Sequence, residues 1–468
     1  MRSVTFQYLW VEGQWRRDVE VRIDDAGCIA QLSHATDGQV EAGSYVAGLT
    51  LPGLADAHCH AFQRVLPPWT QRLGAGRGGA VDDFWSWREA MYAVAGLVTA
   101  TQLEAITARC YLELLRAGYG GVAEFLYLHR LSDGQRGLLD ADMAVAAAAA
   151  RVGIRLTLLP ALYQHGGFGR VPATRGQSRF VRSSAQFLDD WSELERRYPA
   201  ASGVVLGAAF HSLRAVELDT VVAISDRLLA DQRCTMMHLH IAEQPQEVEE
   251  CLRHYGETPV ALLEEHGLLG ARWALIHGIH TRPEELECIA RSQATLVLCP
   301  TTEADLGDGC ADPRPLLAAG GRLAIGSDSN IGRSPYAELR QLEWALRLEQ
   351  GRRNVLASAE QPAVADRLYA IVLAGGWHAV GRPVPGTVGS AADFATFDAL
   401  ALDIIAQQPE NALSALVFDA GAPSAQHVMV GGRWLIRDGL HPQQERIESD
   451  YRAAITQLAA PLRSALSG

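Results

Sequence analysis

Hydrophobic and polar positions follow two different patterns along the chain. Near both ends they alternate with a period of two, as in Val19–Ile23 and Asp393–Asp398. This alternation is typical of half-buried strands, and His427–Gly439 predicts a hairpin that turns at two adjacent glycines. We therefore expect a small β-sandwich domain built from both termini, residues 1–50 and 383–440.

The middle of the chain, residues 51–382, repeats short apolar runs separated by segments with helical spacing, such as Gln102–Ala117. The apolar runs are Gly121–Tyr127, Arg155–Ala161, Gly203–Ala209, Thr235–Ile241, Trp273–His277, Ala294–Cys299 and Leu323–Gly326. Runs of this length predict buried strands. Such a long βαβα series favours a (β/α)8 barrel of the TIM type, and a doubly wound sheet is the competing interpretation.

Three more segments complete the predicted organisation. The glycine-containing stretches 74–79 and 166–176 are expected to be loops over a site. Ile455, Leu458 and Leu462 recur at helical spacing, so residues 441–468 are expected to form a helix packed on the barrel.

Composition and charge narrow the functional classes. The chain has 468 residues, of which 48% are hydrophobic, so it can bury a large core. Its formal net charge is −13, and a chain this acidic is not drawn to nucleic acid or anionic membranes. Its eight cysteines contain no C-x-x-C pair. With neither a signal peptide nor an apolar run of membrane-spanning length in the sequence, we expect a cytoplasmic protein. An anionic substrate would need a local cationic pocket.

The sharpest chemical feature is His58-Cys59-His60, which follows the apolar run Tyr45–Leu54. Residues two apart in a strand point to the same face, so both imidazoles could bind one ion from a strand end. An isolated H-x-H motif is nevertheless a weak signal, because histidine pairs also occur in cores and on surfaces.

Further metal-binding residue types lie at the ends of predicted strands. His240 closes one run, with Glu243 three residues on, His277 closes another, and Asp328 follows a third. Barrel active sites are assembled from such strand ends, and three imidazoles with one carboxylate suit Zn²⁺ or Fe²⁺. Each residue alone could be a core or turn residue, and His238 is ambiguous because it shares a strand face with His240. Together they predict a metal site.

The order H-x-H, His with Glu three residues on, His and Asp resembles the deaminase branch of the amidohydrolase superfamily. Longer runs resemble the formimidoylglutamate deiminases of histidine breakdown, and the similarity spans nearly the whole chain. These runs are His58–Arg64, Phe84–Glu89, Phe210–Val216, His240–Gln244 and Thr302–Gly309.

The resemblance implies a hydrolase that converts N-formimidoyl-L-glutamate to N-formyl-L-glutamate and ammonia. One Zn²⁺, or Fe²⁺, would be held by His58, His60, His240 and Asp328. Asp328 would also accept the proton of the attacking water, Glu243 would protonate the imino nitrogen, and His277 would orient the attacked group. Arg88 and Arg214 would bind the substrate carboxylates, with His211 beside Arg214, and Gln63 and Tyr127 would add hydrogen bonds. The resemblance also implies a homodimer.

Two departures and three rivals qualify this interpretation. Asn330 stands where related chains often have His, and Leu126 stands where His is common. Both leave open a preference for the aspartate homologue.

Three alternative functions compete with this interpretation. Another deaminase acting on a purine or pterin would have stacking aromatics without paired arginines. A metal-binding scaffold would not need Glu243 and His277, and a two-metal hydrolase usually needs a bridging carboxylated lysine.

Overall fold

The computed structural model describes residues 1–35, 44–71, 82–132, 139–230, 233–399, 409–419, 421 and 423–467. The strands are β1 (Arg2–Val11), β2 (Gln14–Ile23), β3 (Ile29–His34), β4 (Tyr45–Pro52), β5 (Leu54–Cys59), β6 (Tyr119–Leu126), β7 (Arg155–Leu162), β8 (Val205–Leu206), β9 (Ala208–Phe210), β10 (Met237–Ile241), β11 (Trp273–His277), β12 (Thr295–Leu298), β13 (Arg322–Ile325), β14 (Phe394–Phe397), β15 (His427–Val430) and β16 (Arg433–Ile436). The helices are α1 (Pro67–Thr70), α2 (Phe84–Leu97), α3 (Ala100–Ala117), α4 (Asp140–Val152), α5 (Ser184–Arg197), α6 (Leu218–Ala230), α7 (Pro245–Tyr255), α8 (Pro259–Glu265), α9 (Pro283–Ser292), α10 (Pro300–Leu306), α11 (Arg314–Ala318), α12 (Pro335–Gln350), α13 (Val364–Ala379), α14 (Ala412–Ser414) and α15 (Gln444–Ser467).

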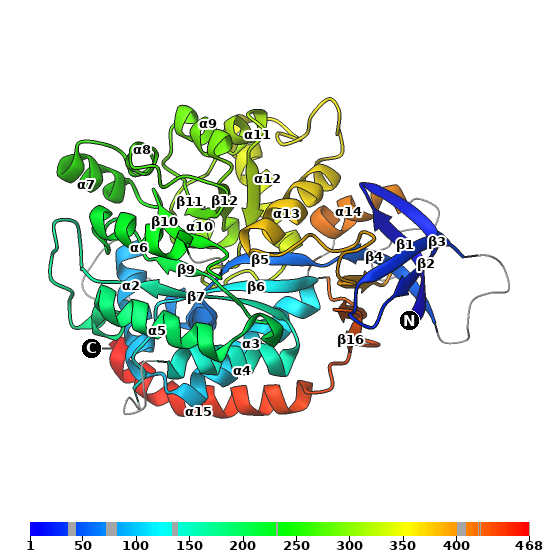
Figure 1. The fold of residues 1–468 in the computed structure, drawn as a ribbon, viewed down its shortest axis with the longest axis horizontal. Coiled ribbons are helices and arrows are strands. Elements are labelled where there is room, and N and C mark those ends of the chain that lie inside the picture. The colour runs from blue at the N-terminus through cyan, green and yellow to red at the C-terminus, as the bar shows by residue number, and fades with distance from the viewer. Residues whose placement is uncertain are drawn as a thin grey trace.

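The two ends of the chain share one seven-stranded sheet, in the order β16-β15-β14-β4-β1-β2-β3. The antiparallel pairing of β14 with β4 joins the C-terminal strands to the N-terminal ones. The sheet curls, because the ring of Phe6 in β1 lies 6.5 Å from that of Trp434 in β16 although three strands separate them in the sheet. Its two halves therefore enclose a common apolar core, as expected of a sandwich-like domain. Figure 1 shows this sheet beside the larger helical body.

Eight parallel strands form the barrel, in the order β5-β6-β7-β9-β10-β11-β12-β13. The seam between β13 and β5 is bridged next to the candidate metal ligands. The N–H of Asp328 donates to the carbonyl of His58 over 2.9 Å, and the N–H of His60 donates to the carbonyl of Asp328 over 3.0 Å. A Cβ at Gly326 would lie 2.7 Å from the Cβ of His58, so this close approach requires glycine. An open sheet has no such seam, so the barrel prediction is confirmed and the doubly wound alternative is wrong.

Two predicted runs have different boundaries in the structure. The run Tyr45–Leu54 contains all of strand β4, which belongs to the small sheet, and the first residue of β5, which belongs to the barrel. Gly53 separates the two strands. No polar residue marks this junction, because both strands are buried. The predicted strand Gly203–Ala209 is split into β8 and β9 around Gly207. A Cβ there would lie 2.5 Å from a methyl carbon of Leu159, so glycine allows the neighbouring strand to approach.

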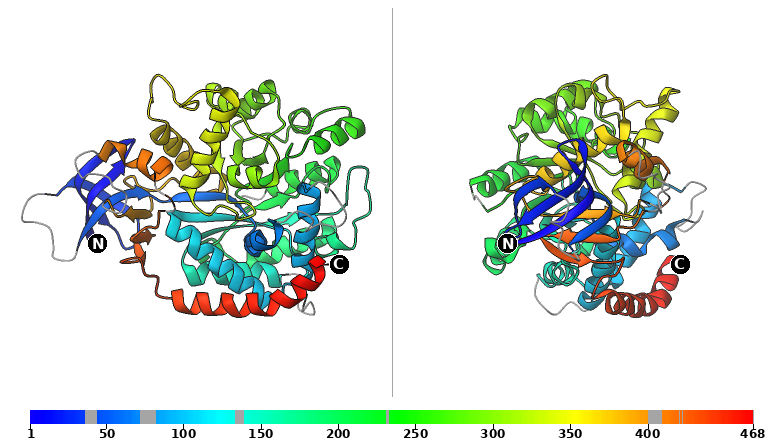
Figure 2. Two further views of the ribbon diagram at one scale, coloured as in Figure 1. Left: turned by 180° about the vertical axis from the view of Figure 1, so that it is seen from behind. Right: turned by 90° about the vertical axis from the view of Figure 1, so that its right-hand side faces the viewer.

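Helix α15 runs along the outside of α2 and α3, and the two termini lie at opposite ends of the molecule (Figures 1 and 2). Leu458 and Leu462 are buried on its inner face. Arg109 of α3 pairs with Glu448 over 3.1 Å, and Gln102 bonds Gln457 over the same distance. None of the described helices is long and apolar enough to cross a membrane.

Candidate active site

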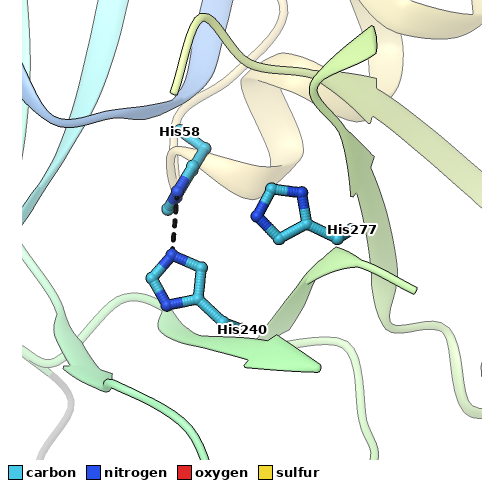
Figure 3. A group of neighbouring side chains, drawn as sticks. All are labelled: His58, His240 and His277. Carbon is cyan, nitrogen blue, oxygen red and sulfur yellow. Dashed lines mark hydrogen bonds between the residues drawn. The ribbon is translucent and has the colours of Figure 1, made fainter. Parts of the chain in front are cut away.

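His58, His60, His240 and Asp328 meet at the carboxyl ends of β5, β10 and β13. Nε2 of His240 lies 3.1 Å from Nε2 of His58 and 3.4 Å from Nε2 of His60. Oδ1 of Asp328 lies 3.4 Å from Nε2 of each of those two histidines. Figure 3 shows the rings of His58 and His240 turned toward each other, with His277 beside them. Ligand atoms at about 2.0–2.1 Å from one tetrahedral zinc lie about 3.3–3.4 Å apart, so these four separations match those between ligands of a single ion.

The backbone orients two of these imidazoles. Nδ1 of His60 donates to the carbonyl of Phe125 over 2.8 Å, and Nδ1 of His240 donates to the carbonyl of His211 over 2.8 Å. A proton on Nδ1 leaves the lone pair on Nε2, which is the atom that faces the cluster. Burial lowers the pKa of both rings, so the neutral, metal-binding form is favoured.

The rim that carries these residues has a rare backbone conformation. Ala242, His277, Asp328 and Asn330 have φ values of +47°, +74°, +45° and +64°. Non-glycine residues seldom adopt this left-handed region unless the surrounding structure fixes it, and such positions cluster at functional sites. Here the seam hydrogen bonds fix Asp328, and the strained turns direct side chains from the ends of β11 and β13 into the barrel mouth.

Glu243 and His277 lie at the edge of the ligand set. Nε2 of His277 is 3.7 Å from Oε1 of Glu243 and 3.9 Å from Oδ2 of Asp328. Burial raises the pKa of Glu243 above its ordinary value, although His277 opposes the shift. Burial alone would lower the pKa of His277, but Glu243, Glu303 and Asp328 outweigh it and raise that pKa. Both groups can therefore carry a proton near neutral pH, as proton transfer requires.

A pocket of about 540 Å³ opens above this cluster, and every predicted site residue except the fully buried His58 contributes to its wall. Arg88 and Arg214 lie together on it, with their guanidinium carbons 4.4 and 6.0 Å from the centre of the Trp85 ring. Arg214 is only 8% exposed. Neither arginine forms an ion pair with any described residue, and Nε of Arg88 is buried without a hydrogen-bond partner. Two such cations in one pocket form a site for anions.

Gln63, Tyr127 and His211 line the same pocket. Nε2 of Gln63 donates to the hydroxyl of Tyr127 over 2.7 Å, and its Oε1 has no partner among the described residues. The His211 ring packs against Tyr127, with centroids 5.4 Å apart, while its carbonyl holds the His240 ring. His211 thus links the anion-binding wall to the metal ligands.

Several residues lie elsewhere than the sequence suggested. His238 shares a strand face with His240 but donates from Nε2 to the carbonyl of Ala379, away from the ligand set. Asn330 and Leu126 are buried and are absent from the pocket wall. Nδ2 of Asn330 donates to the carbonyls of His60 and Asp328, each over 3.0 Å, so this residue braces the seam. His129, outside the predicted ligand set, is buried, and its Nε2 donates to the carbonyl of Ala161 over 2.8 Å.

The structure describes one of the two predicted loops. Stretch 166–176 is a loop, and its Gly176 packs against Tyr92 of the pocket wall, where a Cβ would lie 2.7 Å from the ring. Stretch 74–79 lies outside the described residues.

Sequence reasoning missed Tyr163 on the pocket wall and Glu303, whose Oε1 lies 3.2 Å from Nδ1 of His277. Tyr163 directly follows β7, just as Tyr127 directly follows β6. The rule that barrel sites are built from strand ends would have found it. Glu303 lies in a helix, and no local signal joins it to His277.

Comparisons with known proteins agree with this geometry. A model of the amidohydrolase family matches residues 49–435. Formimidoylglutamate deiminase of Pseudomonas aeruginosa is 39% identical over 92% of this chain and 94% of the relative. 8-Oxoguanine deaminase of the same organism is 27% identical over 88% of this chain and 87% of the relative. The crystal structure of an amidohydrolase from Brucella melitensis superposes with a TM-score of 0.90 and 36% identity over 98% of this chain and 100% of that one.

The family and these deiminase and deaminase relatives indicate an enzyme that hydrolyses C–N bonds. The histidine and aspartate cluster at the barrel mouth is the metal-binding candidate that such chemistry requires. The chain belongs to the amidohydrolase family, in the deaminase branch that includes formimidoylglutamate deiminase.

Proposed function

We propose that this enzyme hydrolyses N-formimidoyl-L-glutamate to N-formyl-L-glutamate and ammonia. The observation that carries the proposal is a pair of arginines, Arg88 and Arg214, that form no salt bridge with any described residue and lie in the pocket that also holds the metal-ligand cluster. A substrate with two carboxylates supplies the missing counter-charges. In a protein with a net charge of −13, this local cationic wall also overcomes the unfavourable long-range field.

The opposite end of the pocket suits the reacting group. Glu243 and Asp328 face His277 there, so the nitrogens of the formimidoyl group would meet acidic side chains while the substrate carboxylates meet arginines. The pocket therefore has opposite charges at its two ends. In the proposed complex a linear substrate would therefore enter in one direction, with its formimidoyl carbon next to His58, His60 and His240.

Each residue then has one task in the reaction. His58, His60, His240 and Asp328 would hold one divalent cation, for which we propose Zn²⁺ with Fe²⁺ as the alternative. Such a cation lowers the pKa of water from about 15.7 towards 7, which supplies hydroxide at neutral pH. Asp328 takes a proton from the attacking water, Glu243 delivers a proton to the imino nitrogen, and His277 orients the attacked group. In the tetrahedral intermediate Glu243 takes back the hydroxyl proton and the proton held by Asp328 passes to the amino group. The C–N bond then breaks, the C=O bond forms and ammonia leaves.

The alternatives differ in the length and shape of the substrate. N-formimidoyl-L-aspartate keeps both carboxylates but is one methylene shorter. A purine is favoured by the relative that is an 8-oxoguanine deaminase and by the aromatic residues of the wall, which include Tyr127 and Phe180. A purine leaves Arg88 and Arg214 without a counter-charge, so we rank it below the dicarboxylates.

The proposal is tested by measuring ammonia release from four substrates at equal concentration. We expect N-formimidoyl-L-glutamate to give the highest kcat/KM and its aspartate homologue to follow about tenfold lower, because one methylene is worth about 1–3 kcal/mol in a fitted pocket. Guanine and adenosine should release no ammonia above the blank. Faster turnover of either purine would overturn the proposal.

Replacing Arg214 with methionine should raise KM for N-formimidoyl-L-glutamate about 30- to 100-fold. A hydrogen bond to a charged group contributes about 1.5–3 kcal/mol, and 1.4 kcal/mol is a factor of ten in affinity. Steady-state kinetics measure the change. The matched control is Arg353→Met, which removes the same charge from an exposed residue that does not line the pocket. An unchanged KM in R214M would show that the carboxylates are bound elsewhere.

We further propose that the reaction belongs to histidine degradation and that the enzyme acts in the cytoplasm. We expect it to be a homodimer that binds a small anionic substrate. Neither nucleic acid nor membrane is expected to bind, given the net charge of −13.

A further inference from the structure

The run Thr302–Gly309 was singled out by its sequence, yet the proposed reaction assigns it no task. Its first five residues lie in α10, and two of them, Thr302 and Glu303, contact the segments that carry the site. Oγ1 of Thr302 accepts the N–H of Ser329 over 3.3 Å and contacts the carbonyl of Ser327 over 3.3 Å, so it holds the turn that carries Asp328. Oε1 of Glu303 lies 3.2 Å from Nδ1 of His277. The short helix α10 thus supports Asp328 through Thr302 and His277 through Glu303.

The contact between Glu303 and His277 is sealed from solvent. Glu303 is 3% exposed and His277 is 1% exposed. The same Oε1 also accepts the N–H of Cys299 over 2.8 Å, which fixes the carboxylate in place. Because Oε1 already acts as the acceptor for the N–H of Cys299, the proton of its contact with His277 lies on Nδ1. Nε2, the other ring nitrogen, is then the atom that faces Glu243 and the pocket.

We propose that Glu303 is a positioning residue that acts through His277, by fixing its ring and the proton on its Nδ1 so that Nε2 meets the reacting group. The inference rests on the proposed function only for the substrate used to measure turnover. A buried imidazole without this acceptor could rotate about its Cβ–Cγ bond or lose the proton on Nδ1. Removing the outer partner of a metal-ligating histidine typically changes affinity or activity about 10- to 100-fold, and we expect a change in this range at His277.

A purely structural task for Glu303 predicts something different. The carboxylate also holds the start of α10 through Cys299, so its loss could destabilise the fold without changing the chemistry. Glu338 offers a matched comparison. It is a fully buried carboxylate that holds the same helix, accepting the N–H and hydroxyl of Thr301 over 2.9 and 2.6 Å, and it does not line the pocket.

The kinetic experiment compares Glu303→Ala, Glu303→Gln and Glu338→Gln. We expect kcat to fall about 100-fold in E303A and about tenfold in E303Q, whose amide oxygen can still accept from Nδ1 and from Cys299. KM should stay within about threefold in both, because Glu303 does not line the pocket. E338Q should lower Tm but keep kcat within about threefold. The inference is overturned if kcat of E303A falls no further than that of E338Q.

A second readout needs no substrate. In enzyme labelled with ¹⁵N-histidine, the Nδ1–H proton of His277 should give a low-field signal, assigned by its loss in His277→Gln. The signal should persist in E338Q, shift in E303Q and disappear in E303A. Persistence in E303A would overturn the inference. If N-formimidoyl-L-glutamate is not turned over, the proposed function fails, but this spectrum still tests the link between Glu303 and His277, and kcat is then measured with the best substrate of the panel.

Discussion

Replacing Glu243 by glutamine is expected to lower kcat about 10³-fold while leaving the bound metal in place. Glutamine keeps the size of the side chain but cannot deliver the proton that the imino nitrogen needs, and general acid–base catalysis contributes about 10²- to 10⁴-fold. Glu243 is not one of the four closely spaced ligand atoms, so metal binding should survive. Steady-state kinetics and elemental analysis of the same sample measure both quantities.

Glu249 provides the control for this variant. It is an exposed glutamate on α7, the helix that follows Glu243, and Glu249→Gln should keep kcat within about twofold. Near-normal kcat in E243Q would remove Glu243 as the proton donor. Loss of metal together with activity would instead make Glu243 a ligand, which would change the donor set described above.

Replacing Asp328 by asparagine should have a still larger effect, lowering kcat at least about 10⁴-fold and reducing metal content. The change removes a ligand charge and the group that takes the proton of water, and loss of that acceptor alone is worth about 10²- to 10⁴-fold. The seam hydrogen bonds of residue 328 use only its backbone, so the barrel should stay closed and Tm should change little. Elemental analysis, kinetics and thermal unfolding measure the three effects.

Chelation of the parent enzyme separates the two tasks of Asp328. Exhaustive dialysis against a chelator should abolish activity, and added Zn²⁺ should restore it in the parent but not in D328N. Activity of D328N within tenfold of the parent, or a chelated parent that remains fully active, would contradict the single-metal reaction.

The strand ends that carry the chemistry are visible in the sequence. His277 is the last residue of β11 and His240 the last but one of β10, and both strands were predicted as apolar runs. This works because barrel strands are buried on both faces, so their sequences are nearly continuous apolar runs whose carboxyl ends lie at the mouth. Residue type and position at a strand end marked candidate metal ligands, and the resemblance to the deaminases selected His58, His60, His240 and Asp328 among them.

The barrel closure was decided only by the tertiary structure. An apolar run of four to eight residues is the same in an open and a closed sheet. What distinguishes them is the seam, where Gly326 lies against His58 and Asp56 accepts the N–H and hydroxyl of Ser327 over 2.9 and 2.6 Å. The division of Tyr45–Leu54 between two sheets is hidden for the same reason, because both strands are buried.

The functional pairings also required the tertiary structure. Sequence similarity suggested that Arg88 and Arg214 act together, but only the fold brings both against Trp85 without a salt bridge to any described residue. Nothing in the local pattern around Glu303 connects it to His277. The sequence alone determined the buried strands and the residue types at their ends, because burial and periodicity are local. The tertiary structure decided which ends meet, because hydrogen bonds and charges between distant segments depend on the closure of the barrel.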